Sequence, residues 1–305
     1  MCLMLANHYY ILLVYCNFFF IFAEKITMIL IADSGSTKTD WCLVDSGTVV
    51  CRVYTQGINP FAQSEEEIGN VIKNELKPKL PNVNIDKIYF YGSGCRPEVA
   101  SVVHGSLINS YPDVKKITVE SDLLGAARAL CGRNMGIACI LGTGANSCLF
   151  DGDSVLKNTP ALGYILGDEG SGAVLGKLFF NAMFKGRLSE KLCREYLNES
   201  KLEMADVIRK VYREPLANRF LASTSLFIGK HIQDPLLSAL VVDNFRSFLR
   251  NNILPYERKD LPVNAIGSVA YYFKEQLMIA ANAEGFTVGE ILQSPIDGLL
   301  RYHIM

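Results

Sequence analysis

Residues 28–53 read MILIADSGSTKTDWCLVDSGTVVCRV, and residues 137–157 read IACILGTGANSCLFDGDSVLK. In each stretch an apolar run is followed by a turn rich in glycine, serine and threonine, a second apolar run, an Asp-Ser-Gly or Asp-Gly-Asp turn and a third run. This alternation predicts three antiparallel strands joined by tight turns. Because the pattern occurs twice at matching offsets, the sequence predicts an α/β protein with a duplicated domain.

The segments that follow each stretch predict further strands and helices. Ser64 and Glu67 form a capping-box pattern that starts a helix ending near Lys77. The remaining elements are expected at these positions: strands over 85–91, 115–120 and 261–266, and helices over 122–130, 170–185, 268–283 and 294–303.

Length and composition narrow the class of protein. A chain of 305 residues is expected to form about two domains. The 50% of apolar residues exclude a disordered chain, and the net charge of −1 excludes the basic surface of a nucleic-acid binder. The 9 cysteines include no C-x-x-C pair and the 4 histidines no zinc-binding pair. The cysteines therefore indicate a reducing, cytoplasmic environment.

Residues 1–27 differ from the rest of the chain. Their apolar run over 9–23 is shorter than the about 20 residues that a membrane helix needs, and it lacks the flanks of a secretory signal. Three interpretations stay open: a spurious extension before a true start at Met28, a membrane anchor or uncleaved signal, or an extra strand or helix. We favour the first, because a predicted strand begins directly at Met28.

Two matched loops could hold phosphate. The first, DSGSTKT over residues 33–39, can form an anion cradle from its backbone N–H groups, and Asp33 could hold Mg²⁺ through water. An ordinary hairpin turn is an equal alternative. The second, LGTGANS over 141–147, is neither a dinucleotide fingerprint nor a Walker A loop. The two loops suggest a nucleotide held from opposite sides of a cleft.

A third loop, GYILGDEGSG over residues 163–172, opens a predicted helix. Asp168 and Glu169 are favoured there by the helix dipole alone. The loop nevertheless contains more glycine than a helix cap needs, which favours close approach of a ligand.

Further polar residues lie at predicted strand ends. Asp122 precedes a helix, so it is either an N-cap or the base that accepts the proton of a substrate hydroxyl. Asn59, in the Asn-Pro turn after the first meander, carries a donor and an acceptor suited to a sugar hydroxyl. Ser93 follows a strand at the sheet edge where α/β proteins commonly bind ligands.

Five motifs appear in a fixed order: IADSGSTKTDW, GINPF, SDLLGAARAL, ILGTGANS and LGDEGSGAVLGK. In these motifs the chain resembles the acetate kinase/sugar kinase/Hsp70/actin superfamily, and within it the N-acetylglucosamine kinases and BadF/BadG/BcrA/BcrD-type ATPases. The resemblance covers nearly everything from Met28 onward. It implies an α/β fold of two duplicated actin-like (ribonuclease H-like) domains, with ATP and Mg²⁺ in the cleft and a sugar beside them. The expected domains span 28–120 and 121–290, the second with a helical insertion, and a helix over 291–305 packs back on the first.

The resemblance also implies roles for particular residues. Asp122 matches the catalytic base and Asp33 the Mg²⁺ site, while Gly267-Ser268 resembles the adenosine-binding turn. The sugar is expected near Asn59, Asn146 and Asp168, with Ser93 as a further candidate. The expected phosphate-binding residues are Ser34, Gly35, Ser36, Thr37, Lys38, Gly142, Thr143 and Gly144.

The chain departs from the family in two respects. Ser34 and Ser36 replace glycines of the usual Asp-Gly-Gly-Gly-Thr loop, and the turn should survive if neither position needs a positive φ. The cysteine pair that binds an iron–sulfur cluster in the dehydratase activators has no evident match, which argues against an electron-transfer role.

The sequence therefore predicts an ATP-dependent kinase that transfers a phosphoryl group to the 6-hydroxyl of N-acetylglucosamine or a related amino sugar. Two alternatives are an ATPase that couples its nucleotide state to a protein partner and a sugar sensor without catalysis. The expected partner is the small-molecule sugar, with no nucleic acid, and with a membrane only if residues 1–27 are a genuine anchor. The family resemblance suggests a homodimer.

Overall fold

The computed structural model describes residues 27–35 and 37–304. The interpretations of residues 1–27 therefore lie outside the described residues except for Thr27, and the prediction for Ser36 lies outside them too. Within the described part, the structure contains no helix with the length and apolar character that a membrane crossing requires.

The first sheet is built from the first quoted stretch and two later strands. β1 (Met28–Ser34), β2 (Lys38–Asp45) and β3 (Thr48–Gln56) form the predicted antiparallel meander. β4 (Lys87–Gly92) and β5 (Lys116–Ser121) extend the sheet in parallel on the other side of β1. The strand order is β3-β2-β1-β4-β5.

The second sheet repeats this arrangement strand for strand. β6 (Gly136–Leu141), β7 (Ala145–Phe150) and β8 (Val155–Lys157) form the second antiparallel meander. β9 (Val263–Ile266) and β10 (Val288–Leu292) add parallel strands beside β6, so that the order is β8-β7-β6-β9-β10. Because order and direction match in both sheets, the predicted duplication is confirmed.

Helices cover one face of the first sheet. α2 (Glu65–Val71) begins at the capping box of Ser64 and Glu67, and continues through η1 (Ile72–Leu76) and η2 (Lys77–Lys79). With α3 (Ala100–Ser110), these helices bury a core that includes Trp41 of β2 and Phe90 of β4. The predicted extent of the first helix, to about Lys77, is close to the observed one.

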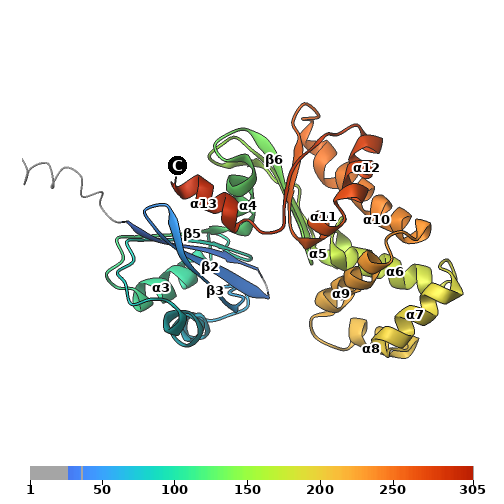
Figure 1. Cartoon of the computed structure of the whole chain (residues 1–305), viewed down its shortest axis with the longest axis horizontal. Coiled ribbons are helices and arrows are strands. Elements are labelled where there is room, and N and C mark those ends of the chain that lie inside the picture. The colour runs from blue at the N-terminus through green and yellow to red at the C-terminus, as the bar shows by residue number, and fades with distance from the viewer. Residues whose placement is uncertain (1–26, 36, 305) are drawn as a thin grey trace, which may run out of the picture.

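Two equivalent helices pack between the sheets. α4 (Asp122–Cys131) follows β5, and α13 (Ile296–Ile304) follows β10. Both contribute to one buried cluster with apolar residues of β1, β2, β6 and β7. The helices approach closely, because a Cβ placed on Gly298 would lie 2.4 Å from the carbonyl oxygen of Ala129. Figure 1 shows α4 and α13 side by side between the two sheets.

α13 also bonds directly to the first sheet. Asp297 accepts a 2.7 Å hydrogen bond from Arg52 of β3. The ring of His303 stacks on Tyr89 with centroids 3.7 Å apart, and its Nε2 lies 2.8 Å from the hydroxyl of Tyr91. Burial and the charge of Arg128 lower the pKa of His303 to about 4, so the ring is neutral at neutral pH.

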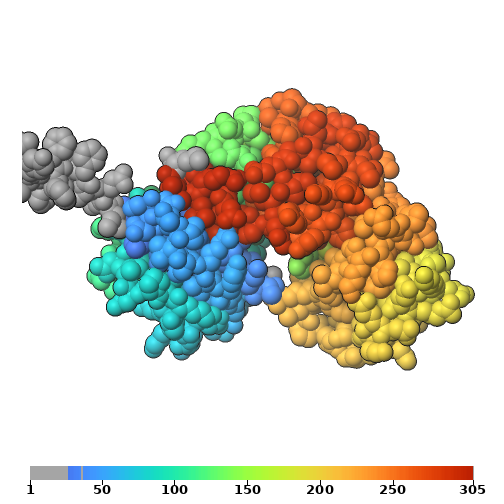
Figure 2. All heavy atoms as spheres, viewed as in Figure 1, coloured from blue at the N-terminus to red at the C-terminus, as the bar shows by residue number. Residues whose placement is uncertain are grey.

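The other helices gather on the second sheet and give the molecule two lobes (Figure 1). They enclose the largest apolar cluster, which includes Phe179, Phe245 and Phe248. Figure 2 shows the surface hollowed between the first lobe and this helical part. The helices are α5 (Gly163–Leu166), α6 (Gly172–Phe184), α7 (Glu190–Ser200), α8 (Met204–Tyr212), α9 (Ala217–Lys230), α10 (Pro235–Phe248), η3 (Leu249–Ile253), η4 (Leu254–Tyr256), α11 (Ser268–Tyr272) and α12 (Lys274–Glu284).

Candidate active site

The first loop connects β1 to β2 and places a carboxylate at its base. Gly35 N–H donates to the Lys38 carbonyl at 3.0 Å, which closes the turn. Asp33 lies opposite Asp40 across the two strands, so both side chains are on the same face of the sheet. Burial first, and then the charges of Asp122 and Asp40, raise the pKa of Asp33 to about 7, while the charge of Lys38 opposes the rise. Asp33 is thus a partly buried carboxylate, and the positive charge of Lys38 does not offset the three effects that raise its pKa.

Ser34 has a structural position in this loop. Its side chain is fully buried, its hydroxyl lies 2.7 Å from that of Thr39, and it donates to the carbonyl of Ile58 at 3.0 Å. The same oxygen accepts from Ile58 N–H at 2.9 Å. The hydroxyl is therefore occupied by protein groups, and any contact of Ser34 with a phosphate is left to its backbone. Its φ is not positive, so the turn tolerates serine in place of glycine.

Thr37 and Lys38 of the same loop are exposed. Thr37 accepts a hydrogen bond from Gly57 N–H through its carbonyl at 3.0 Å. Lys38 extends over the ring of Tyr54, with its ammonium 5.0 Å from the ring centre. Its electrostatic effect on Asp33 places it close to the predicted phosphate site.

The Asn59 loop is attached to the first loop through Ser34. The Asn59 side-chain oxygen accepts from Phe61 N–H at 3.0 Å, and Asn59 N–H donates to the side chain of Gln63 at 2.7 Å. Ser93 N–H donates to the Ser34 carbonyl at 2.8 Å, which brings the β4 loop to the same place. The predicted residues Ser34, Asn59 and Ser93 therefore form one group.

Asp122 is the first residue of α4, but it is not the cap of that helix. Ser121 is the N-cap, because its hydroxyl accepts from Leu124 N–H at 3.2 Å. The Asp122 carboxylate accepts from Leu123 N–H at 2.9 Å, while burial raises its pKa. The pKa of Cys95 is raised mainly by burial and then by the charge of Asp122. Asp122 thus lies close to both Asp33 and the loop after β4, and the N-cap alternative is excluded.

The second loop lies against the start of α6. The carbonyls of Gly142 and Thr143 accept from Gly172 N–H at 2.8 Å and Ala173 N–H at 3.1 Å. These bonds satisfy the first donors of the helix, so its N-terminus is not an anion site of its own. Within the described chain, the N–H groups of Thr143 and Gly144 have no acceptor. They are the donors that a phosphate could use.

Asp168 is folded back onto the second loop. Its backbone is left-handed, with φ 56°, and its N–H donates to the Ala161 carbonyl at 2.9 Å. The carboxylate lies beside Gly144, where an added Cβ would be 3.1 Å from Oδ2, and close enough to Ala145 N–H for that group to lower its pKa. Burial raises its pKa. Ser171 caps α6, so neither Asp168 nor Glu169 is the cap of that helix.

The adenosine turn expected at Gly267-Ser268 also meets the second loop. Gly267 has φ 122°, and an added Cβ would lie 2.3 Å from the Leu141 carbonyl oxygen. Only glycine fits this position. Ser268 is exposed and begins α11. Gly142, Thr143, Gly144, Asn146, Asp168 and Gly267 are therefore a second group, and α4 packs between it and the group around Asp33.

Sequence reasoning missed three residues that organise these groups. Asp40 faces Asp33, and the period-2 alternation of β2 could have placed it there. Asn158 donates to the Asn146 side chain at 2.9 Å. Asn244 of α10 accepts from Gly170 N–H at 2.9 Å and donates to the Ser171 carbonyl at 3.1 Å. Nothing in the sequence near 244 signals that contact, because it joins segments far apart in the chain.

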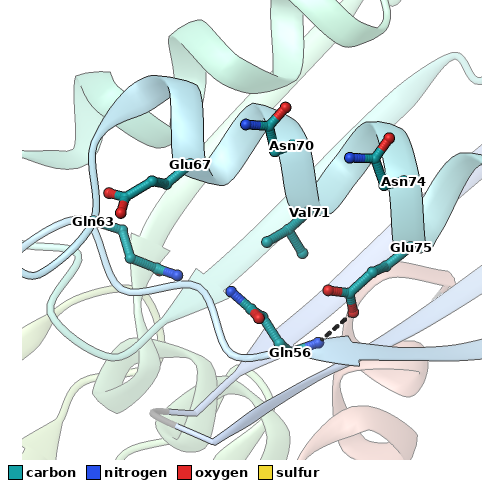
Figure 3. Close-up of a pocket in the computed structure, with 7 residues that line it drawn as sticks. All are labelled: Gln56, Gln63, Glu67, Asn70, Val71, Asn74 and Glu75. Carbon is teal, nitrogen blue, oxygen red and sulfur yellow. Dashed lines mark hydrogen bonds between the residues drawn. The ribbon is translucent and has the colours of Figure 1, made fainter.

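Two surface hollows lie away from the predicted residues. One of about 250 Å³ is in the helical part, between the start of α7 and the end of α9. The other, of about 270 Å³, lies between the end of β3 and the helix α2–η1. Figure 3 shows Gln56 and Gln63 pointing toward one another in it, with Gln56 N–H bonded to Glu75 at 2.9 Å. None of the predicted site residues that the structure describes lines either hollow.

One solved structure is similar to this chain along nearly its whole length. It comes from Porphyromonas gingivalis, is named "Putative N-acetylglucosamine Kinase" and is 50% identical, with a TM-score of 0.89 over 91% of this chain and 99% of that chain. The chain belongs to the N-acetylglucosamine kinase family. The family assignment and the two-sheet fold expected from it are confirmed, and as a member the chain is classed with the phosphotransferases.

Other solved structures share the fold of this family member. A protein of the same name from Chromobacterium violaceum is 18% identical, with a TM-score of 0.68 over 92% of this chain and 99% of that chain. A ROK hexokinase from Thermus thermophilus is 16% identical, with a TM-score of 0.50 over 90% of this chain and 96% of that chain. No family model and no curated protein matches the chain.

Proposed function

We propose that this family member is an ATP-dependent kinase that phosphorylates N-acetylglucosamine, or a closely related amino sugar, at its 6-hydroxyl. One observation carries the proposal beyond family membership. Asp122 lies close enough to Asp33 for its charge to raise the pKa of Asp33. A kinase needs this arrangement, with a base for the acceptor hydroxyl beside the carboxylate that serves the phosphate and its metal.

The residues around Asp33 fit Mg²⁺. Asp33 has its pKa raised to about 7 because burial and two neighbouring carboxylates disfavour its charge, and a divalent cation would relieve this. The described residues include no cluster of three or more His, Cys, Asp or Glu suited to a metal. Mg²⁺ usually keeps several waters and binds one or two carboxylates together with substrate phosphates, so Asp33 suffices on the protein side. When bound, the ion supplies neutralisation of the phosphate charge.

The chain's own groups then have separate roles in binding and in proton transfer. Asp122 accepts the proton of the sugar 6-hydroxyl as that oxygen attacks the γ-phosphorus of ATP, and ADP leaves. The N–H groups of Thr143 and Gly144, which have no acceptor among the described residues, donate to phosphate oxygens. Asp168 accepts from a sugar hydroxyl, and Asn59 and Asn146, whose side-chain oxygens are already bonded, donate through their amide nitrogens. The turn at Gly267 and the start of α11 bind the adenosine.

The test is turnover of the full chain with ATP and Mg²⁺ against N-acetylglucosamine, N-acetylmannosamine, N-acetylmuramate, glucosamine and glucose. We expect an amino sugar 6-phosphate, identified by phosphorus NMR. Asp122→Asn should lower kcat by about 10²–10⁴ and change the sugar KM little. The matched control is Asp113→Asn, at an exposed aspartate of the same lobe.

Other outcomes would overturn the proposal. ATP hydrolysis that no sugar stimulates would indicate an ATPase coupled to a protein partner. Sugar binding without formation of ADP would indicate a sensor. Full activity of Asp122→Asn would remove Asp122 as the base.

A further inference from the structure

The side-chain amide of Asn146 has a defined orientation. Its Oδ1 accepts from Ser147 N–H at 2.9 Å and from the Asn158 Nδ2 at 2.9 Å. A backbone N–H can only donate, so the atom facing Ser147 must be the oxygen. The Asn146 nitrogen is therefore directed away from both partners, and no described residue accepts a hydrogen bond from it.

Asn158 has an equally defined orientation. Besides Asn146, its Nδ2 donates to the Ser147 carbonyl at 2.7 Å, and the Thr159 carbonyl, at 3.2 Å, shares one of its two hydrogens. Carbonyl oxygens only accept, so the nitrogen of Asn158 must occupy this position. If the Asn158 amide turned over, three acceptors would face its oxygen.

The segment that carries Asn158 is itself anchored to the helical part. Thr159 N–H donates to the hydroxyl of Tyr256 at 3.1 Å, and the Thr159 hydroxyl donates to the Asn252 carbonyl at 2.9 Å. The Tyr256 hydroxyl also lies 2.7 Å from that of Ser147 on β7. These hydrogen bonds fix the distance between Asn158 and β7. An asparagine on a loop without such bonds would not be held in place.

Asn146 lies on the side of β7 where α4 packs. Side chains alternate along a strand, so Asn146 shares a face with Cys148 and Phe150. Those two residues pack in the cluster that α4 shares with the first sheet. Asn146 is thus the residue of this face nearest the second loop, where Asp168 also lies.

We propose that Asn158 is a positioning residue that holds the Asn146 amide with its nitrogen toward the sugar, so that the sugar atom opposite it must be an acceptor oxygen. This inference rests on the proposed function. The sugar group that faces Asn146 is then a hydroxyl or acetamido oxygen and not an ammonium, because two donors cannot bond to each other.

The decisive variant is Asn158→Asp, which keeps the size of the side chain and replaces its donor by an oxygen. Asn146 should turn its nitrogen toward the new carboxylate and release Ser147 N–H. We expect the sugar KM to rise about tenfold, with the KM for ATP unchanged, because one hydrogen bond to the sugar is lost. The matched control is Asn109→Asp on α3, where the replaced amide donates to Glu65 at 3.0 Å far from the site.

A double-mutant cycle separates positioning from general damage. In an Asn146→Ala background, Asn158→Asp should change the sugar KM less than about twofold, since the group it orients is gone. An equally large effect in both backgrounds would overturn the inference.

A second measurement does not depend on the sugar. Hydrogen exchange of the Ser147 amide should accelerate in Asn158→Asp, because its acceptor has turned away. Unchanged exchange would overturn the positioning role whatever the substrate is. If the wild-type chain binds none of the sugars, the proposed function fails, whereas sugar binding with an unaltered KM in Asn158→Asp overturns this inference alone.

Discussion

Asp33 is a carboxylate that the fold holds partly out of water beside two others. Its pKa rises from 3.8 to about 7, mainly through burial. Between these pH values the folded state binds a proton that the unfolded state has released. The free energy of unfolding therefore falls as the pH rises through this window. The negative charge of Asp33 favours binding of a cation, but it lowers the free energy of unfolding when no cation is bound.

Asp33→Asn should stabilise the metal-free protein at pH 8 while it abolishes activity. The full shift corresponds to about 4 kcal/mol, and because Asp33 is only partly buried we expect about half of that. The measurement is urea unfolding in EDTA at pH 5 and pH 8, where the variant should lose most of the pH dependence. Asp113→Asn serves as control, and a less stable Asp33→Asn at pH 8 would contradict the argument.

Ser34 shows how a residue in a binding loop can act by holding another loop. Ser34→Ala leaves Ile58 N–H and its carbonyl without the partner they share, in a place that water does not reach. We expect a loss of about 2–3 kcal/mol in the free energy of unfolding. Because Asn59 follows Ile58, the sugar KM should rise more than the KM for ATP. Steady-state kinetics and urea unfolding check both, with the exposed Ser46→Ala as control; equal effects on both KM values would refute the link to Asn59.

The glycines illustrate what the sequence could not predict at this scale. The abundance of glycine in residues 163–172 favoured close approach of a ligand. In the structure Gly170 lies against Phe248, where an added Cβ would be 2.9 Å from the Phe248 Cβ. A Cβ added to Gly172 would be 3.1 Å from the Cβ of Ala222 in α9. Protein packing therefore accounts for these two glycines. The sequence shows the glycines, but it does not show which distant residues pack against them.

At the scale of elements, α4 and α13 pack against each other at close range. A Cβ on Gly298 would lie 2.4 Å from a backbone oxygen of α4, and backbone cannot move aside like a flexible side chain. Gly69 of α2 is a matched helical glycine with nothing within 4 Å of the same hypothetical atom. The two positions therefore respond in opposite directions to the same substitution.

Gly298→Ala should destabilise the protein by about 1–3 kcal/mol through overpacking. Gly69→Ala should stabilise it by about 0.5–1 kcal/mol, because alanine is the better helix former. Urea unfolding measures both in parallel. A stabilising Gly298→Ala would mean that α13 does not dock on α4 as described.

Elements with strong local signals were predicted and those with weak ones were not. The meanders, α4 and the capping box of α2 are encoded by turn residues and caps close in sequence. β10 was missed, because VGEIL is a short, half-exposed edge strand that reads as part of a loop. α3 begins at Ala100, after residues 96–99 have formed turns. The predicted helix over 268–283 is split at Phe273 into α11 and α12.

At the scale of the molecule, the fold follows from a duplication that the sequence displays twice, whereas the site depends on contacts that join distant segments. Asp33 and Asp122 are 89 positions apart in the numbering, and Asp168 reaches Gly144 only because α6 packs on the second sheet. The motif order predicted candidate residues, which the structure gathers into the groups around Asp33 and around Gly144. The orientation of Asn146 and the support from Asn244 required the structure.

Two lobes that share one buried cluster around α4 and α13 can hinge there, and ligands that touch both lobes should favour the closed form. Apolar side chains next to the proposed sugar-binding residues Asn59 and Asp168 are exposed in this structure: Phe61 by 76% and Leu166 by 76%. Burial of these two side chains on closure contributes favourable free energy, which neither ligand supplies alone. Binding of the sugar and of ATP should therefore be coupled.

We expect N-acetylglucosamine to tighten the binding of a non-hydrolysable ATP analogue about 5–150-fold, with the same factor in the reverse direction. Calorimetry measures the coupling, and small-angle scattering should show a smaller radius of gyration only with both ligands. Asp122→Asn should keep the coupling, because closure depends on contacts and not on proton transfer. Phe61→Ser should reduce it while the analogue alone binds as before. Independent binding with an unchanged radius would mean that the lobes do not close, and water would then have to be excluded from the reacting phosphate by the sugar alone.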